Sequence, residues 1–201
     1  MTTPRPLPDT ETRLGTVELR DDDGESRITG YAAIFNTLSE NLGGFREQIR
    51  SGAFDSVLTN DVRALFNHDP SLILGRTTAG TLSLDSDGTG LRYRIEPPDT
   101  QAARDLIKSI QRGDVTQSSF AFQVDDDRWE EDDDGRLIRT IIAIKRLYDI
   151  SPVTYPAYPD TTVASRSMDH FRSVAQKARI EGERERDHCR LRLIRSQIIA
   201  A

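Results

Sequence analysis

Histidine is scarce in this sequence, so its positions narrow the chemistry that the chain can perform. Of the three histidines, His170 and His188 lie in a charged C-terminal stretch, where solvated positions are expected. His68 is the one remaining, and it ends an apolar run just before Asp69 and Pro70, where a strand gives way to a loop. A histidine there suits a structural role or general-base chemistry. Because the rest of the chain has only this one histidine, a metal centre built from several histidines is not expected there.

Two adjacent serines occupy an alternating run, VTQSSFAFQV, at residues 115–124. Side chains alternate between the two faces of a strand, so Ser118 shares the face of Phe120 and Phe122, which is the core face. Ser119 points the other way, beside smaller neighbours that leave room for a substrate chain. If one serine is a nucleophile, Ser119 is the better placed. An ordinary outward-facing polar position is the alternative interpretation.

Asp149 is the third residue of interest, because it is an acid late in the run LIRTIIAIKRLYDI and just before a proline-rich turn. A carboxylate there can orient a histidine, or it can be a surface acid. The acidic stretch at 125–135 lacks the glycine and closing glutamate of a calcium-binding EF-hand loop, so it predicts a solvated hairpin tip. Cys189 is the single cysteine, which excludes an intrachain disulfide and a four-cysteine zinc site.

The elements that would position these residues are mostly strands. Alternating or apolar runs separated by turn residues predict strands at 15–20, 26–35, 61–66, 81–86, 90–96, 115–124 and 137–150. A helix is predicted from about Asp99 to Arg112, with Asp99 or Thr100 as its cap and Gly113 ending it. A shorter helix is predicted over 53–59. The sequence therefore predicts a predominantly antiparallel β domain with a few helices.

Charge divides the chain of 201 residues into a body and a tail. Residues 164–201 hold nine basic and five acidic residues, a net charge of +4, so the rest carries -10 of the total of -6. The predicted parts are a disordered lead-in (1–14), a β domain (15–163) and an amphipathic helical tail (164–201) interrupted near Gly182. The acidic balance argues against a wholly basic nucleic-acid binder. Without a long apolar run, an intracellular protein is expected.

Four segments, in this order, resemble the prohead (capsid maturation) serine proteases of tailed phages, prophages and phage-derived particles. They are GYAAIF with FREQIRSGAF, then ALFNHDPSLILGRT, then IQRGDVTQSSFAFQV, then LYDISPVTYPAYPDT. Each segment alone is a weak signal, whereas their shared order over residues 28–165 is a strong one. That family is related in fold to the herpesvirus assemblins, so the resemblance implies a closed β-barrel surrounded by helices.

The resemblance also assigns roles to residues. The family's histidine lies in an N-H-D motif, which here contains His68, and its serine precedes a phenylalanine in a G-M-S-F-G-F-like strand, which matches Ser119. This sequence has Gln117, Ser118 and Ala121 where that motif has Gly, Met and Gly, so Ser118 stays as a second candidate. The family usually has Glu before its V-S-P-V-T segment, and Asp149 stands there.

The resemblance implies a serine endopeptidase with His68 as general base, Ser119 as nucleophile and Asp149 orienting the histidine. It implies no metal or organic cofactor. The implied substrates are the scaffolding segment of the major capsid protein and the enzyme's own tail, cut inside an assembling prohead in the bacterial cytoplasm. The resemblance is compatible with self-association. It implies neither membrane binding nor binding to a specific nucleic acid. A catalytically inactive scaffold or capsid-assembly protein on the same fold is the alternative. An unrelated peptide-binding β module would leave the four segments unexplained.

Overall fold

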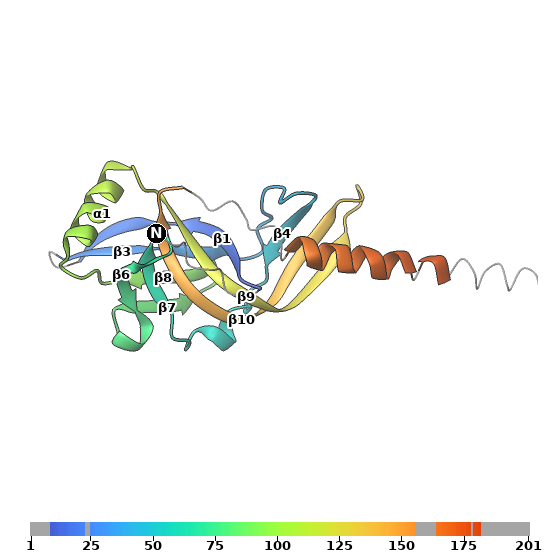
Figure 1. Ribbon diagram of the computed structural model, residues 1–201, viewed down its shortest axis with the longest axis horizontal. Helices are drawn as coiled ribbons and strands as arrows, with labels where there is room; N and C mark the ends of the chain where they lie inside the picture. The colour runs from blue at the N-terminus through green and yellow to red at the C-terminus, as the bar shows by residue number, and fades with distance from the viewer. Residues whose placement is uncertain (1–8, 23–24, 156–163, 178, 182–201) are drawn as a thin grey trace, which may run out of the picture. The chain divides into compact units, whose positions relative to one another are not determined.

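The computed structural model describes residues 9–22, 25–155, 164–177 and 179–181 (Figure 1). The chain divides into two compact units, residues 1–163 and 164–201, and the division falls where the net charge changes sign. The second unit is helical over 164–177 and 179–181. The later apolar repeat and the break near Gly182 lie outside the described residues.

The first unit is mainly β and contains two sheets. The six-stranded sheet has the order β1(Glu11–Thr16), β9(Gln117–Glu131), β10(Leu137–Val153), β5(Arg63–Phe66), β6(Asp69–Arg76), and β4(Phe45–Ile49) also pairs with β10. The four-stranded sheet has the order β2(Glu18–Asp22), β3(Glu25–Ile34), β8(Gly90–Ile95), β7(Leu82–Ser86). The three hairpins expected from the sequence are present as β2–β3, β7–β8 and β9–β10. Strands β1, β4 and β6 were not predicted.

Strands β9 and β10 form a long antiparallel ribbon that runs through the unit. It is longer than predicted, because β9 continues through the acidic stretch to Glu131. The register shifts at several points between Ile141 and Asp149, so β-bulges change which side chains of β10 face the core. One edge of β10 pairs in parallel with β4 at the start of the strand and with β5 near its end.

The two sheets meet where β1 passes through Val17 into β2, so one stretch of chain belongs to both sheets. The backbones approach closely at this crossing. A Cβ on Gly15 would lie 2.3 Å from the carbonyl oxygen of Tyr31, and one on Gly30 would lie 2.0 Å from that of Thr16. Glycine is therefore required at both positions. The Tyr93 hydroxyl donates to the same Thr16 carbonyl (2.8 Å) and ties the second sheet to this point.

The predicted closed barrel surrounded by helices is wrong. In the part of the chain that the structure describes, the strands form two open sheets, with β1 and β6 outermost in one and β2 and β7 outermost in the other. The sheets share the corner where β1 continues into β2, and a bridge between Phe35 and Ile49 also links the end of β3 to β4. Buried apolar residues of both sheets pack together in one core. The mainly β character with some helix is confirmed.

Helix α1(Gln101–Arg112) matches the prediction. The Thr100 side chain accepts the N–H of Ala103, and Gly113 ends the helix with a φ of 82°. The helix predicted over 53–59 is only a short 3-10 turn, Asp55–Val57. No helix within the described ranges is long and apolar enough to cross a membrane.

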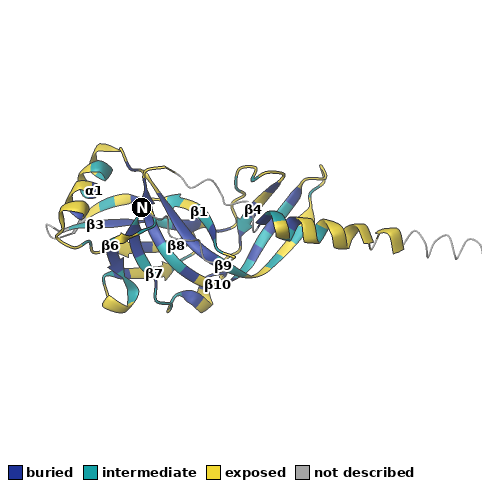
Figure 2. Ribbon diagram, in the orientation of Figure 1, coloured by how far each residue is buried: buried dark blue, intermediate teal, exposed yellow. Residues whose placement is uncertain are grey.

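Buried apolar residues from both sheets and from α1 form one continuous core. Figure 2 shows the buried positions concentrated on β3, β8, β9 and β10, with the outer side of α1 exposed.

The predicted disordered lead-in (1–14) extends too far along the chain, since strand β1 already begins at Glu11. A buried glutamate and a nearly buried arginine alternate there, at Glu11 and Arg13, so this strand lacks the apolar pattern by which strands are recognised.

Candidate active site

His68 lies at the tip of the β5–β6 hairpin. Phe66 pairs with Asp69, so the turn between them has only two residues, Asn67 and His68. Their φ angles are 54° and 56°, as in the type I′ turns that join tightly twisted strands. Asparagine tolerates this conformation well, and histidine is also enriched in it among residues other than glycine. The sequence placed His68 where a strand becomes a loop, and the structure places it in a tight turn between two strands.

Asn67 fastens this turn to the end of β10. Its backbone N–H donates to the carbonyl of Pro152 (3.0 Å), and its side-chain oxygen accepts the N–H of Thr154 (2.8 Å). Its side-chain amide also donates to the Thr154 hydroxyl (3.2 Å). These contacts fix the neighbouring imidazole relative to β10, the strand that carries Asp149.

Asp149 holds the imidazole of His68. The distance between His68 Nδ1 and Asp149 Oδ1 is 2.6 Å, and the Ser151 hydroxyl donates to the same oxygen (2.8 Å). An ionised carboxylate only accepts hydrogen bonds, so Nδ1 carries a proton, and in the neutral imidazole Nε2 is the nitrogen that can accept one. Asp69, the other acid beside His68, accepts two hydrogen bonds from Ser71 instead. These two bonds lower the pKa of Asp69.

Ser119 lies on the face of β9 opposite to Phe120, as the alternation predicted. Its cross-strand partner on β10 is Ser151, and Ala121 pairs with Asp149 two residues along. Cross-strand partners share a face, so Ser119 and the Asp149 carboxylate lie on the same face of the sheet. Ser118 faces the core, where its hydroxyl donates to the carbonyl of Thr16 (2.9 Å).

Ser119, Asp149 and His68 therefore come from three successive strands of one sheet, β9, β10 and the end of β5. The structure joins His68 to Asp149 by a hydrogen bond, and it does not join Ser119 to His68 by one. The Ser119 hydroxyl oxygen and His68 Nε2 are both buried, and neither has a hydrogen-bond partner within the described chain. Buried polar atoms are nearly always paired, so two unpaired ones beside a carboxylate-bound histidine make this face the candidate active site.

Two residues of this arrangement escaped the sequence reasoning. Ser151 orients the Asp149 carboxylate, and Asn67 anchors the histidine turn. Ser151 had a usable signal, because residues two apart on a strand share a face and Ser151 follows Asp149 by two. For Asn67 the sequence contains a signal only when Asn67 and His68 are interpreted as the two central residues of a hairpin turn.

A second polar cluster lies along the first half of β10 and contains five charged side chains. The Arg139 guanidinium contacts Glu11 (2.7 and 3.0 Å), Glu47 (2.9 Å) and Asp127 (2.6 Å). Arg13 contacts Glu47 (2.6 and 2.8 Å) and Glu11 (2.7 Å). Burial raises the pKa of Glu11, but its hydrogen bonds and charge contacts with Arg139 and Arg13 outweigh burial and hold the pKa below its usual value. We refer to these five residues as the charge cluster.

The described residues contain no group of three or more histidine, cysteine, aspartate or glutamate side chains arranged to hold a metal ion. The acidic stretch of β9 is largely exposed, and Asp127 is engaged by Arg139. The candidate site itself brings together a hydroxyl, an imidazole and a carboxylate.

The chain is similar in sequence to known proteins. Residues 15–174 match the family model of the caudovirus prohead serine proteases. The chain is 31% identical over 158 residues to the prohead protease of Enterobacteria phage HK97, a match that covers 76% of this chain and 66% of that protein. This chain therefore spans just under two thirds of that relative's length. Among solved structures, the bacteriophage T4 capsid assembly protease aligns with a TM-score of 0.44 and 10% identity, covering 72% of this chain and 98% of that one.

The stretch that matches the family model begins in β1 and extends into the helix of the second unit. It includes the histidine turn, both adjacent serines and the strand that carries the aspartate. The chain belongs to the family of caudovirus prohead serine proteases.

Proposed function

We propose that this protein is a serine endopeptidase in which Ser119 is the nucleophile, His68 the general base and Asp149 the residue that orients the histidine. The observation that carries the proposal is the His68–Asp149 hydrogen bond of 2.6 Å, which leaves Nε2 unpaired on the face that holds the unpaired Ser119 hydroxyl. Membership of a serine protease family supports the same assignment.

The reaction follows from these positions. His68 Nε2 accepts the hydroxyl proton as Ser119 Oγ bonds to the carbonyl carbon of the scissile peptide. The same proton then passes to the leaving amine as the carbon–nitrogen bond breaks, which leaves an ester on Ser119. A water molecule, deprotonated by Nε2, attacks the ester and releases the acid product. Asp149 keeps Nδ1 protonated and stabilises the imidazolium that forms in each half of the reaction.

The active groups are buried, and this constrains how a substrate reaches them. The Ser119 hydroxyl and His68 Nε2 have essentially no solvent exposure. Peptide binding must therefore expose both atoms and bring the hydroxyl within hydrogen-bond distance of Nε2. Such tightening on substrate binding is common for catalytic hydrogen bonds.

The proposed substrates are the scaffolding segment of the major capsid protein and this chain's own tail, both cut inside an assembling prohead in the bacterial cytoplasm. The family of the chain and its HK97 relative, a prohead protease, support this proposal. The tail, 164–201, has a charge opposite to that of the body. We place its removal after Pro159, at a position outside the described residues, and assign the tail to targeting before removal.

A catalytically inactive capsid-assembly protein on the same fold is the second candidate. The missing hydrogen bond between Ser119 and His68 favours it, as do Gln117, Ser118 and Ala121 in place of the residues usual in the family motif. The intact His68–Asp149 pair favours the enzyme, because a protein without catalysis gains nothing from an oriented imidazole with a free Nε2.

Activity measurements on two matched variants separate these candidates. The full chain is co-expressed with the capsid protein encoded beside it, and the products are identified by mass spectrometry. Ser119→Ala should abolish cleavage of the capsid protein and of the tail, whereas Ser118→Ala, one residue away and on the core face, should retain both. Cleavage by Ser119→Ala that is lost in Ser118→Ala would show that the nucleophile is misassigned. Absence of any cleavage by the wild-type protein would favour the inactive assembly protein.

A further inference from the structure

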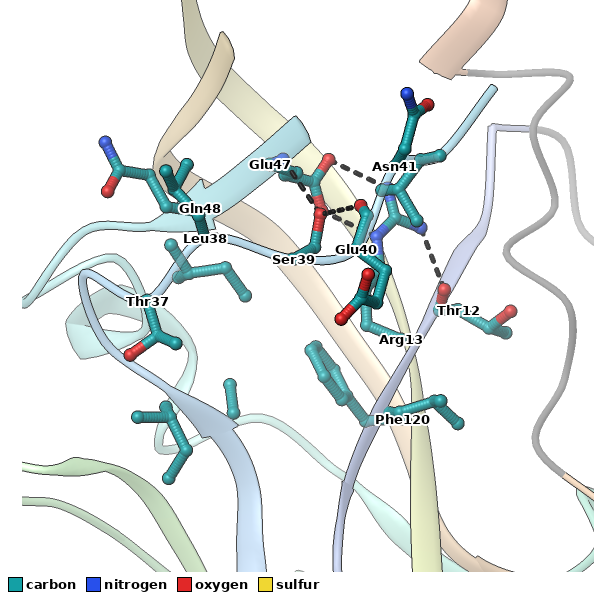
Figure 3. Close-up of a pocket in the computed structure, with 15 residues that line it drawn as sticks. Thr12, Arg13, Thr37, Leu38, Ser39, Glu40, Asn41, Glu47, Gln48 and Phe120 are labelled. Carbon is teal, nitrogen blue, oxygen red and sulfur yellow. Dashed lines mark hydrogen bonds and ion pairs between the residues drawn. The ribbon is translucent and has the colours of Figure 1, made fainter. Parts of the chain in front are cut away.

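A cavity of about 410 Å³ lies beside β1, on the side of that strand away from β9. Its walls come from β1, the end of β3, the loop that follows β3, and β4, and Phe120 of β9 reaches it from the core (Figure 3). This volume falls within the range of ligand-binding clefts in proteins. No residue of the proposed triad lines the cavity, so it is a separate feature of the structure.

The cavity gathers apolar side chains that are otherwise rare on the surface. Leu14, Ile34 and Leu38 are 44%, 41% and 42% exposed, and they are three of the seven large apolar side chains exposed among the described residues. All three line the cavity. Figure 3 shows Leu38 and Phe120 pointing into the same space from different walls. Exposed apolar groups gathered at a cleft indicate a binding surface.

Several of the polar groups in the walls are already paired, which leaves few of them available to a ligand. Arg13 and Glu47 form a double hydrogen bond with each other (2.6 and 2.8 Å). Ser39 donates to the carbonyl of Glu40 (2.7 Å), and Asn41 accepts two backbone N–H groups of the loop that follows it. The surface left for a ligand is therefore mainly aliphatic and aromatic.

The register of β1 connects the cavity to the proposed active site. Leu14, which lines the cavity, is the cross-strand partner of Ser119. Strands lie about 4.8 Å apart, so the space beyond β1 is about 10 Å from the β9 backbone at Ser119, or about three residues of an extended chain. β1 is also an edge strand. β3 covers its outer side at Gly15 and Thr16, whereas Glu11–Leu14 pair with β9 alone among the described strands, and such an unpaired edge accepts an extended peptide.

We propose that this cavity is a specificity subsite, which binds an aliphatic side chain of the peptide substrate about two to four residues from the scissile bond. The peptide lies extended beside the edge of β1, and its apolar side chain packs against Leu14, Ile34 and Leu38. This inference rests on the proposed function, since it needs a peptide held at Ser119. It adds a substrate preference that the triad cannot supply.

The test uses the full chain and a mixture of peptides from an unrelated proteome, with the new ends identified by mass spectrometry. The wild-type protein should prefer Leu, Ile, Val or Met over Ala by about tenfold or more at one position within four residues of the cut. Leu38→Ser should reduce this preference at least about threefold, because a wall of the subsite becomes polar. Ile73→Ser is the matched control, since Ile73 is 49% exposed on β6 and does not line the cavity.

The possible outcomes are distinct. A preference that Leu38→Ser lowers and Ile73→Ser leaves unchanged supports the subsite. Cleavage without an aliphatic preference, or with one that Leu38→Ser leaves intact, overturns the subsite while the proposed endopeptidase stands. A change in oligomeric state caused by Leu38→Ser without a change in preference also overturns it, because the cavity then binds a second copy. If the wild-type protein cuts no peptide, both the proposed function and the subsite fail.

Discussion

The β9–β10 ribbon carries buried polar side chains near both of its ends, and the two groups differ in how they are paired. Near the start of β10, Arg139 is 2% exposed and contacts three carboxylates. Near its end, Asp149 is paired with His68, yet His68 Nε2 and the Ser119 hydroxyl have no partner. Both regions bury polar atoms, which therefore lose their hydrogen bonds to water. Only in the first region are these bonds replaced throughout by contacts within the protein.

This difference fits a structural role for the first group and the proposed catalytic role for the second. A buried unpaired polar atom costs about 1–3 kcal/mol, and such a cost is retained where the atom is kept available for a substrate. The charge cluster satisfies its members with one another and joins β1, β4, β9 and β10. We therefore expect substitutions near the start of β10 to lower mainly stability. Substitutions near its end should lower mainly activity.

The largest effect is expected at Ser119 and His68. Ser119→Ala and His68→Ala should each lower kcat by about 10⁴- to 10⁶-fold, and the double variant should be no worse than either, because the two residues act as one unit. Cleavage kinetics with a fixed peptide would measure this. Additive losses in the double variant would contradict a shared role.

The same Ser119→Ala variant should not be less stable than the wild-type protein. Its free energy of unfolding should rise by up to about 1 kcal/mol, because the substitution removes a buried hydroxyl that has no partner. Denaturant unfolding would measure the change. Ser118→Ala provides the contrast, since it leaves the carbonyl of Thr16 with one hydrogen bond fewer and should destabilise the fold.

Asp149→Asn should lower kcat by about 10³- to 10⁴-fold while leaving measurable activity. An asparagine side chain no longer stabilises the imidazolium and can favour the wrong tautomer, but the nucleophile and base remain. Asp149→Glu, which restores the acid usual in the family, should retain more activity than Asp149→Asn. Activity of Asp149→Asn equal to that of the wild-type protein would remove this residue from the site.

Arg139→Met should lower the free energy of unfolding by about 3–5 kcal/mol, because it leaves buried carboxylates with too few cations. Arg128→Met is the matched control. Arg128 lies on the same ribbon, its side chain is 72% exposed, and its ion pair with Glu130 is long at 3.6 Å, so its loss should change stability by less than about 0.5 kcal/mol. Equal effects of the two substitutions would show that the charge cluster does not stabilise the fold.

The same comparison explains what the sequence could predict. The alternation at 115–124 correctly placed Phe120 and Phe122 in the core and Ser119 on the opposite face, because side chains in a regular strand follow a period of two. Asp149 was harder to orient, since bulges in β10 interrupt that period just before it. Its partnership with His68 depends on parallel pairing between β5 and β10, which no local pattern contains.

The parts of the fold that were missed have physical reasons too. β1 was assigned to a disordered lead-in because its buried side chains include Glu11 and Arg13, which become favourable inside the protein only through long-range ion pairs. The charge cluster had one signal in sequence. Arg139 alternates with Leu137 and Ile141, both buried, and an arginine in such a row needs carboxylate partners. Which acids provide them is decided by the pairing of four strands.

Acid should weaken the charge cluster in a way that can be assigned to Glu11. The pKa of Glu11 in the folded protein is lower than the usual value for glutamate, which is about 4.3. Its stabilisation is therefore complete above that usual value and is lost as the pH falls through the lower, folded pKa, because the unfolded chain binds the proton more readily. Glu11→Gln should be less stable than the wild-type protein at neutral pH, and this difference should shrink below about pH 4. Glu130→Gln, at an exposed glutamate, should show no such convergence in urea unfolding measured across pH.

The smallest effect is expected from Ser151→Ala, which tests how precisely Asp149 must be oriented. The Ser151 hydroxyl donates to the same Oδ1 that accepts His68 Nδ1, so its removal leaves the histidine contact in place but frees the carboxylate to rotate. One hydrogen bond to a charged group is worth about 1.5 kcal/mol, which corresponds to a loss in kcat of about tenfold. Ser151→Thr should recover most of that loss, because it restores the hydroxyl. The KM for a given peptide should stay unchanged in both variants, since Ser151 acts on the base and not on substrate binding. A rise in KM without a fall in kcat would place Ser151 in contact with the peptide instead.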